Sequence, residues 1–178
     1  MSTVTVFGAG AWGSTMAQVL SDAGNDVLLW GRSKDVIAEI NSAHTNKKYL
    51  GKHELPLSLQ ATTDLGQAFA HSHIYVLAIP AQQLRLTLEE WKPFFSTDSI
   101  IVSTLKGIEI STQMRMTEVI EDVLGPRAVA IITGPNLADE LVLRQPAGAV
   151  ARAHRARLGG QARADGRPRQ HVRARRRR

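Results

Sequence analysis

Cysteine is absent from this 178-residue chain. Its absence excludes disulfides, thiolate nucleophiles and cysteine-based zinc sites together, and it fits a cytoplasmic protein. The sequence also lacks any apolar run near the roughly 20 residues that a membrane-spanning helix needs. The first residues lead directly into a strand-like run, without the charged and apolar regions of a signal peptide. We therefore expect a cytoplasmic protein with no membrane span, long enough for one domain with its own core plus a tail.

Acidic residues are nearly missing from one part of the chain. Up to Ala151 there are 11 basic and 15 acidic residues, whereas the 27 residues from Arg152 to Arg178 hold 11 arginines and one acid, Asp165. The basic segment also has no Phe, Trp or Tyr and very little other apolar surface to bury. Ordering one residue costs about 1–2 kcal/mol of backbone entropy. We therefore expect a domain over residues 1–151 and a disordered tail over residues 152–178.

The origin of this tail has two interpretations. Arg, Ala, Gly and Pro are the residues that GC-rich codons specify when they are read in the wrong frame, and lysine, which occurs six times before residue 152, is absent after it. The first interpretation is therefore a frameshifted end. The alternative is a genuine basic tail that binds nucleic acid non-specifically through its charge, although it has no aromatic side chain on which a base can stack.

Short apolar runs alternate with amphipathic segments before residue 152, as in repeated βαβ units. Strands are predicted over residues 3–7, 26–30, 74–79, 100–103 and 128–132, and helices over residues 11–23, 34–43 and 112–123. The polar segment 46–59, which contains Pro56, is predicted to be a long loop. The uninterrupted apolar run 74–79 is typical of a strand buried on both faces of a parallel sheet. The sequence thus predicts an α/β domain with a doubly wound, mostly parallel sheet of the Rossmann type.

A glycine pattern, G-x-G-x-x-G, stands between the first predicted strand and the first predicted helix. Gly8 permits a tight turn, Gly10 lets a pyrophosphate approach the backbone, and Gly13 lets the helix pack close to the strand. The helix N-terminus then offers free N–H groups to the phosphates. Because a strand precedes the pattern and a helix follows it, we interpret it as a dinucleotide-binding loop; the alternative is a turn that binds nothing.

The end of the second predicted strand carries a cation instead of an acid. Many NAD-binding domains place Asp or Glu there to hold the ribose 2′-hydroxyl. Here Gly31 and Arg32 follow the strand, and the next acid is Asp35. A cation at this place suits the 2′-phosphate of NADP(H), so Arg32 is predicted to favour that cofactor; the alternative is a solvated surface arginine.

Two further glycine turns follow later predicted strands. Lys106 lies in the turn after residues 100–103, and Gly134 and Asn136 lie in the turn after residues 128–132. Ligands of open α/β sheets bind at such carboxyl ends of strands. Lys106 offers an ammonium group, and Gly134 and Asn136 offer hydrogen-bond donors; the alternative is that both are ordinary turns. No histidine spacing indicates a metal site.

As a set, these motifs resemble the bacterial NAD(P)-dependent glycerol-3-phosphate dehydrogenases. The resemblance rests on five strings that match in order and spacing: Val6–Ala17, Val76–Pro80, Ser103–Glu109, Thr133–Glu140 and Gln145–Val150. The last of them matches the strand that closes the N-terminal domain of that family. The resemblance therefore covers residues 1 to about 150.

The resemblance implies reversible hydride transfer between NADP(H) or NAD(H) and dihydroxyacetone phosphate, giving sn-glycerol 3-phosphate for phospholipid synthesis. Together with the glycine loop, the implied cofactor-binding residues are Gly8, Gly10, Ala11, Trp12, Gly13, Arg32, Tyr49, Lys106 and Ala138. The implied substrate-binding residues are Lys106, Gly134 and Asn136. Tyr49, in the long loop, would close over the cofactor.

This chain departs from the family after about Ala151. Members of the family continue into a helical domain that supplies the proton-donating lysine and most of the phosphate site, and full-length members are expected to form homodimers. We therefore predict a cofactor-domain fragment that is inactive by itself and has no catalytic residue of its own. Two alternatives are a non-catalytic dinucleotide-binding module with a nucleic-acid-binding tail, and a reductase of the same superfamily that acts on another carbonyl compound.

Overall fold

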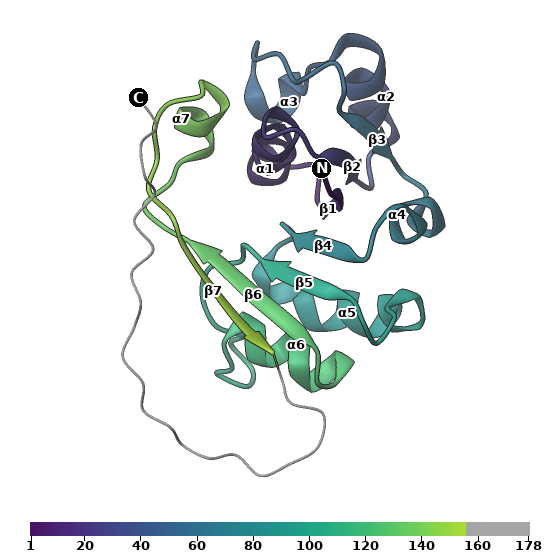
Figure 1. The fold of residues 1–178 in the computed structure, drawn as a ribbon, viewed down its shortest axis with the longest axis vertical. Coiled ribbons are helices and arrows are strands. Elements are labelled where there is room, and N and C mark those ends of the chain that lie inside the picture. Colours follow the sequence, from purple (N-terminus) through teal and green to yellow (C-terminus); the bar gives the residue numbers. More distant parts are fainter. Residues whose placement is uncertain (156–178) are drawn as a thin grey trace.

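A seven-stranded sheet with helices on both sides forms the molecule (Figure 1). The structure, a computed structural model, describes residues 1–155. The strands are β1 (Thr3–Phe7), β2 (Asp26–Trp30), β3 (Gln60–Thr62), β4 (Ile74–Leu77), β5 (Ile100–Ser103), β6 (Ala128–Thr133) and β7 (Val150–Arg155). The helices are α1 (Ala11–Asp22), α2 (Lys34–Ala43), α3 (Lys47–Leu50), α4 (Leu65–His71), α5 (Leu84–Trp91), α6 (Met116–Leu124) and α7 (Ala138–Val142), with short 3₁₀ turns η1 (Ala81–Gln83) and η2 (Lys92–Phe94).

The strand order is β3-β2-β1-β4-β5-β6-β7, and every neighbouring pair is parallel except β6–β7. The chain winds outward from β1 through β2 to β3 and then returns to β4 on the other side of β1. The connections that leave the carboxyl ends of β1 and β4 therefore run in opposite directions, which makes this place a topological switch point, where open α/β sheets bind their ligands. The predicted doubly wound, mostly parallel sheet is confirmed.

Alternate residues of the central strands belong to two separate apolar cores, one on each face of the sheet. In β1, Val4 and Val6 join the apolar cluster that packs under α1 and α2, whereas Phe7 joins the cluster under α4, α5 and α6. In β4, Val76 belongs to the first cluster, and Tyr75 and Leu77 belong to the second. This two-residue period places apolar side chains on both faces, and it explains why these strands read as continuous apolar runs.

Aromatic rings fill the second core directly beneath the carboxyl ends of β1 and β2. The Phe7 ring lies 4.9 Å from the Trp91 ring and 4.8 Å from the Phe69 ring, between centroids, and Trp30 meets Trp91 edge-on at 5.0 Å. Such tilted and edge-on pairs add to the stabilisation that buried area alone provides. The end of the sheet that carries the switch point thus rests on a rigid base.

The predicted end of the folded domain at Ala151 is four residues too early. Strand β7 runs to Arg155 and pairs antiparallel with β6, so residues 152–155 belong to the sheet and not to a disordered tail. Backbone pairing needs no apolar side chains, which is why a composition argument missed it. The segment 145–149, interpreted as part of a closing strand, is not a strand; pairing begins at Val150. The remainder of the predicted tail, 156–178, lies outside the described residues.

Three further differences concern local structure. The third predicted helix begins at Met116 instead of Thr112, because residues 109–115 form a turn in which the Glu109 amide donates to the Met114 carbonyl. The predicted long loop contains the single-turn helix α3. Elements β3, α4 and α5 had no prediction at all. No helix within residues 1–155 is long and apolar enough to cross a membrane.

Candidate functional site

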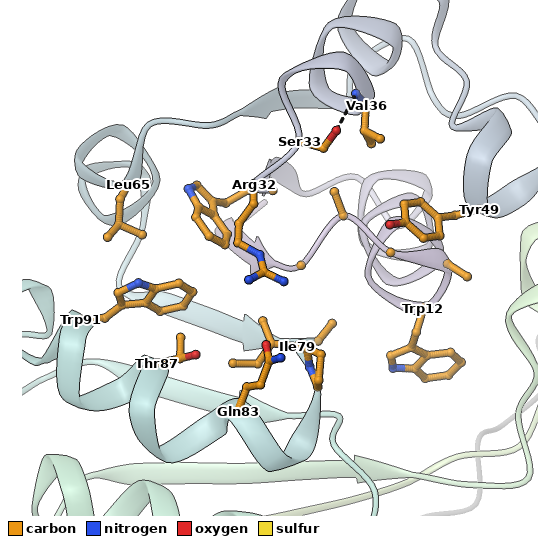
Figure 2. A pocket seen from close by; sticks show the side chains of 18 of the residues that line it. Trp12, Arg32, Ser33, Val36, Tyr49, Leu65, Ile79, Gln83, Thr87 and Trp91 are labelled. Carbon is orange, nitrogen blue, oxygen red and sulfur yellow. Dashed lines mark hydrogen bonds between the residues drawn. The ribbon is translucent and has the colours of Figure 1, made fainter.

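A cleft of about 820 Å³ opens at the switch point, above the carboxyl ends of β1, β2 and β4 (Figure 2). It is called the switch-point cleft below. Its lining comes from the glycine loop, the end of β2, α3, the segment after β4, and α5. The predicted site residues among its lining are Gly8, Gly10, Ala11, Trp12, Arg32 and Tyr49.

The three glycines of the loop differ in what a side chain would meet at each position. Gly8 has a φ of +120°, and a Cβ there would lie 2.4 Å from the carbonyl oxygen of Ala78 in the segment after β4. A Cβ on Gly13 would lie 1.7 Å from the carbonyl oxygen of Gly8, so α1 packs directly on the loop. At Gly10 a Cβ would meet no protein atom within 4 Å. Gly8 and Gly13 are therefore explained by packing, whereas the space at Gly10 is open.

That open space lies at the N-terminus of α1. Gly10 is the N-cap residue and supplies no side-chain cap, and the first turn holds no acid. The first bond of the helix runs from the Ser14 amide to the Gly10 carbonyl at 3.0 Å, so the preceding N–H groups have no intrahelical acceptor. An anion placed there gains both these donors and the positive end of the helix dipole. A side chain at Gly10 would fill the same volume.

Arg32 follows β2 and points into the switch-point cleft (Figure 2). Its side chain is exposed, and it forms no ion pair with any acid of residues 1–155. The neighbouring Ser33 caps α2 by accepting a hydrogen bond from the Val36 amide at 3.5 Å. The guanidinium is thus carried by a fixed strand end and is available to an anionic group in the cleft.

The opposite wall comes from η1 and α5, which sequence reasoning missed. Gln83, Thr87, Glu90 and Trp91 line it at a spacing that keeps them on one helical face. Trp91 and Trp30 serve two purposes, because both are core residues, 4% and 8% exposed, and both line the cleft. The signal that would have found this wall is the amphipathic period of residues 84–91, which begins soon after the strand-end residue Pro80.

Trp12 and Tyr49 both lie at the other end of the cleft (Figure 2). Tyr49 is carried by α3 and is 42% exposed. Trp12, in the first turn of α1, is partly covered, and its indole nitrogen has no hydrogen-bond partner among the described residues. Both rings are therefore positioned as walls of the cleft and not as core residues.

The remaining predicted residues do not line the switch-point cleft. Lys106, Gly134 and Asn136, together called the strand-end cluster below, gather beyond β5 and β6. The Lys106 ammonium donates to the Gly134 carbonyl at 3.3 Å and lies 5.9 Å from the centroid of the Trp12 ring. Lys106 thus joins the glycine loop to the turn after β6. Ala138 begins α7, which packs against α1, and it lies outside the cleft lining.

Gly134 and Asn136 lie against each other. A Cβ on Gly134 would lie 2.7 Å from the side-chain nitrogen of Asn136 and 2.5 Å from the carbonyl oxygen of Gly148. Asn136 is 8% exposed, and its side-chain oxygen has no partner among the described residues. Gly134 is therefore required by the close approach of the chain before β7, a packing reason that the sequence did not reveal.

The turn that carries Lys106 is held by an ionic network behind it. Gly107 turns the chain with a φ of +103°. The buried carboxylate of Glu109 accepts hydrogen bonds from Arg85 of α5 at 3.0 and 3.2 Å and from Thr112. The Arg85 hydrogen bonds, followed by that of Thr112, hold the pKa of Glu109 below its usual range. The network ties the Lys106 turn to the helix that forms the far wall of the switch-point cleft.

A metal site is not formed by the described part of the chain, in which no group of three or more His, Asp and Glu residues lies together. The chemistry available at the cleft is instead that of free N–H groups, one arginine, one lysine nearby and several aromatic faces. This donor set suits an extended, phosphate-bearing molecule with flat rings.

Comparison with known proteins identifies the family of this chain. Residues 3–158 match the family described as NAD-dependent glycerol-3-phosphate dehydrogenase N-terminus. The chain is 48% identical, over 147 residues, to the glycerol-3-phosphate dehydrogenase [NAD(P)+] of Streptomyces avermitilis, and the match covers 82% of this chain and 44% of that protein. The chain therefore spans less than half the length of the curated relative that it matches.

Solved structures show the same arrangement. The glycerol-3-phosphate dehydrogenase of Coxiella burnetii superimposes with a TM-score of 0.79 at 26% identity, covering 85% of this chain and 47% of that one. The enzyme of the same name from Saccharomyces cerevisiae gives a TM-score of 0.80 at 26% identity, covering 90% of this chain and 50% of that one. Each comparison aligns the described sheet with one part of a longer chain.

Proposed function

The chain belongs to the NAD-dependent glycerol-3-phosphate dehydrogenase family, and on this basis we propose that its switch-point cleft binds NADP(H) or NAD(H). The observation that carries the proposal is the open space at Gly10, in front of the uncapped N-terminus of α1. A pyrophosphate fits there because it needs close approach to backbone N–H groups. Trp12, Tyr49 and the apolar surface of the cleft supply faces for the flat rings.

Within this proposal Arg32 sets the preference between the two cofactors. It is exposed to the cleft and free of any acidic partner within residues 1–155. A 2′-phosphate on the adenosine ribose gives it a charged acceptor, whereas the 2′-hydroxyl of NAD does not. The chain should therefore favour the phosphorylated cofactor.

The proposed reaction is the reversible reduction of dihydroxyacetone phosphate to sn-glycerol 3-phosphate. The cofactor, when bound, supplies the hydride. Lys106 places a positive charge beside Trp12, and the strand-end cluster adds the Gly134 backbone and the Asn136 amide within reach of the same region. The side-chain oxygen of Asn136, which is buried and has no partner among the described residues, is proposed as an acceptor for a substrate hydroxyl. Ala138 is proposed as a further cofactor contact through its position after this turn.

We further propose that these residues bind and orient ligands but do not complete catalysis. Hydride addition to a ketone leaves negative charge on the oxygen, and a positioned proton donor contributes about 10²–10⁴-fold to the rate. Lys106 already donates to the Gly134 carbonyl and is exposed to water, where its charge stabilises a transition state less than it would in a closed site. The chain alone should therefore bind cofactor and turn over slowly.

The test separates binding from turnover. Titration with NADPH and NADH, followed by calorimetry, should give saturable binding with NADPH the tighter ligand. NADPH oxidation with dihydroxyacetone phosphate should be at least about 100-fold slower than for the full-length Streptomyces avermitilis relative under the same conditions. Absence of any dinucleotide binding would reject the proposal, and turnover within about tenfold of the relative would reject the proposed dependence on a further proton donor.

The alternative is a dinucleotide-binding module without catalytic activity. The exposure of Lys106 at the strand-end cluster favours it over an active enzyme in isolation. The titration and the turnover assay distinguish the two, because the module binds NADPH and shows no oxidation with any amount of the ketone. Homodimerisation, and non-specific nucleic-acid binding by the basic end of the chain, remain predictions.

A further inference from the structure

Asn46 lies between α2 and α3 and is fully buried. It is the N-cap residue of α3, and asparagine at an N-cap usually accepts a hydrogen bond from the helix with its side chain. Here the side chain makes no such bond. The side-chain amide of Asn46 therefore has its hydrogen-bond partners outside α3.

The side-chain nitrogen of Asn46 donates instead to the glycine loop. One bond reaches the carbonyl oxygen of Ala9 at 3.1 Å, and a second reaches the hydroxyl oxygen of Ser14 at 2.9 Å. Ala9 precedes Gly10, and Ser14 donates its own amide to the Gly10 carbonyl at 3.0 Å. The two acceptors thus flank the open space at Gly10 on either side along the chain.

The backbone of Asn46 holds a second wall of the same cleft. Its carbonyl oxygen accepts hydrogen bonds from the Tyr49 amide at 3.1 Å and from the Leu50 amide at 2.8 Å, and these bonds form the single turn of α3. Glu39 ties this segment to α2, accepting from the Thr45 hydroxyl at 2.7 Å and from the Lys47 amide at 3.0 Å. Tyr49 is thus carried on a turn whose first residue is pinned to the glycine loop.

We propose that Asn46 is a positioning residue of the dinucleotide site, which sets the glycine loop and Tyr49 in one geometry. The proposal rests on the function proposed above. Asn46 itself is buried behind the loop and does not line the switch-point cleft, so it acts through residues that do. A helix of one turn is too short to hold Tyr49 in place by its own stability, which is why a buried side-chain tether is needed.

The first test compares Asn46→Ala with Asn41→Ala. Asn41 of α2 is the control, because its side-chain amide also makes two hydrogen bonds, donating to the Ala61 carbonyl and accepting from the Ala61 amide at 2.8 Å, and neither residue lines the switch-point cleft. Unlike Asn46, Asn41 is exposed. Losing the two bonds of Asn46 should weaken NADPH binding by about tenfold, the equivalent of one or two ordinary hydrogen bonds. Asn41→Ala should leave the dissociation constant within about twofold.

The second test measures coupling, which a role in stability alone would not produce. Tyr49→Ala should weaken NADPH binding in the otherwise unchanged protein. In the Asn46→Ala background the same substitution should have a clearly smaller effect, because Tyr49 is no longer held against the ligand. Equal effects of Tyr49→Ala in both backgrounds would overturn the proposal.

A milder variant guards against loss of folding. Ser14→Ala removes one of the two acceptors and leaves the bond to the Ala9 carbonyl, and it should weaken NADPH binding by about threefold. Unchanged NADPH affinity in both Asn46→Ala and Ser14→Ala, or in Ser14→Ala if the former does not fold, would refute the role of Asn46. Failure of the unmodified chain to bind NADPH would instead refute the proposed function itself.

Discussion

The switch-point cleft and the strand-end cluster lie at the same edge of one sheet but are built differently. The cleft has walls from the glycine loop, the end of β2, α3 and α5, and its aromatic floor is part of the core. The strand-end cluster has Lys106 exposed to water, and the Lys106 ammonium lies 5.9 Å from the centroid of the Trp12 ring, which lines the cleft. Among the described residues, the proposed cofactor region thus has walls on several sides, whereas the proposed substrate region has its lysine exposed.

The difference shows how much of a dehydrogenase a single doubly wound domain can hold. Binding a dinucleotide draws on N–H groups and flat apolar walls, with a cation where the cofactor carries a 2′-phosphate, and a strand-helix turn and its neighbours can supply all of these. Hydride transfer needs, in addition, a proton donor in a site that excludes water. Groups suited to the first role lie within residues 8–91. In the strand-end cluster the Lys106 ammonium is exposed and already donates to the Gly134 carbonyl.

The largest expected effect is that of Gly10→Val. Apart from its chain neighbours, no protein atom lies within 4 Å of a Cβ placed at Gly10, so the fold should persist while the pyrophosphate loses its donors. Loss of two hydrogen bonds to a charged group should weaken NADPH binding by more than about 100-fold, measured by calorimetry. Gly148→Val is the matched control, since a Cβ at this position also meets open space, and this variant should bind NADPH normally. Normal NADPH binding by Gly10→Val would show that the pyrophosphate does not lie at Gly10.

A smaller effect is expected for Arg32→Ala. Removing a charged hydrogen bond to the 2′-phosphate should weaken NADPH binding by about tenfold or more and leave NADH nearly unchanged. Lys34→Ala removes a nearby exposed cation that does not line the cleft, and it should alter neither constant. Equal losses for both cofactors would show that Arg32 packs on the adenine instead.

Lys106→Ala should affect cofactor binding still less. Its ammonium lies 5.9 Å from the Trp12 ring and is exposed, and such cation–π contacts contribute about 0.5–1 kcal/mol, or roughly two- to fivefold in affinity. The substitution should act mainly on the binding of dihydroxyacetone phosphate. In a thermal shift assay, this ketone should raise the melting temperature of the NADPH complex of the unmodified chain but not that of Lys106→Ala. A tenfold or larger loss of NADPH affinity would place Lys106 within the cofactor site proper.

The smallest effect concerns acid stability behind the Lys106 turn. Because Arg85 lowers the pKa of Glu109 in the folded chain, ionised Glu109 stabilises the fold fully above its ordinary pKa of 4.5. That contribution is lost as the pH falls through the lowered value. Glu109→Gln should therefore unfold at lower urea concentration than the unmodified chain at pH 6, and the two midpoints should converge as the pH falls below 4.5. A constant difference between the midpoints would exclude this linkage.

Much of this protein was determined by the sequence alone. Glycine spacing between an apolar run and an amphipathic segment predicted the loop, and the bounds of β1, β2 and α2 followed from apolar periodicity. These are local properties, in which each residue's neighbours along the chain decide its conformation. The same local signals placed Gly10 and Arg32 at the carboxyl ends of strands, and the structure brings both to one cleft.

Tertiary structure decided the rest, because contacts between distant segments leave little trace in local sequence. The wall made by Gln83, Thr87 and Glu90 depends on how α5 crosses the sheet, and β7 depends on pairing with β6 and not on its own side chains. Asn46 has a residue type that often caps helices, yet its side-chain nitrogen donates to the carbonyl oxygen of Ala9, 37 positions away in the sequence. A buried polar group takes whichever partner the fold brings to it; the side-chain nitrogen of Asn46 finds two, and its side-chain oxygen finds none among the described residues.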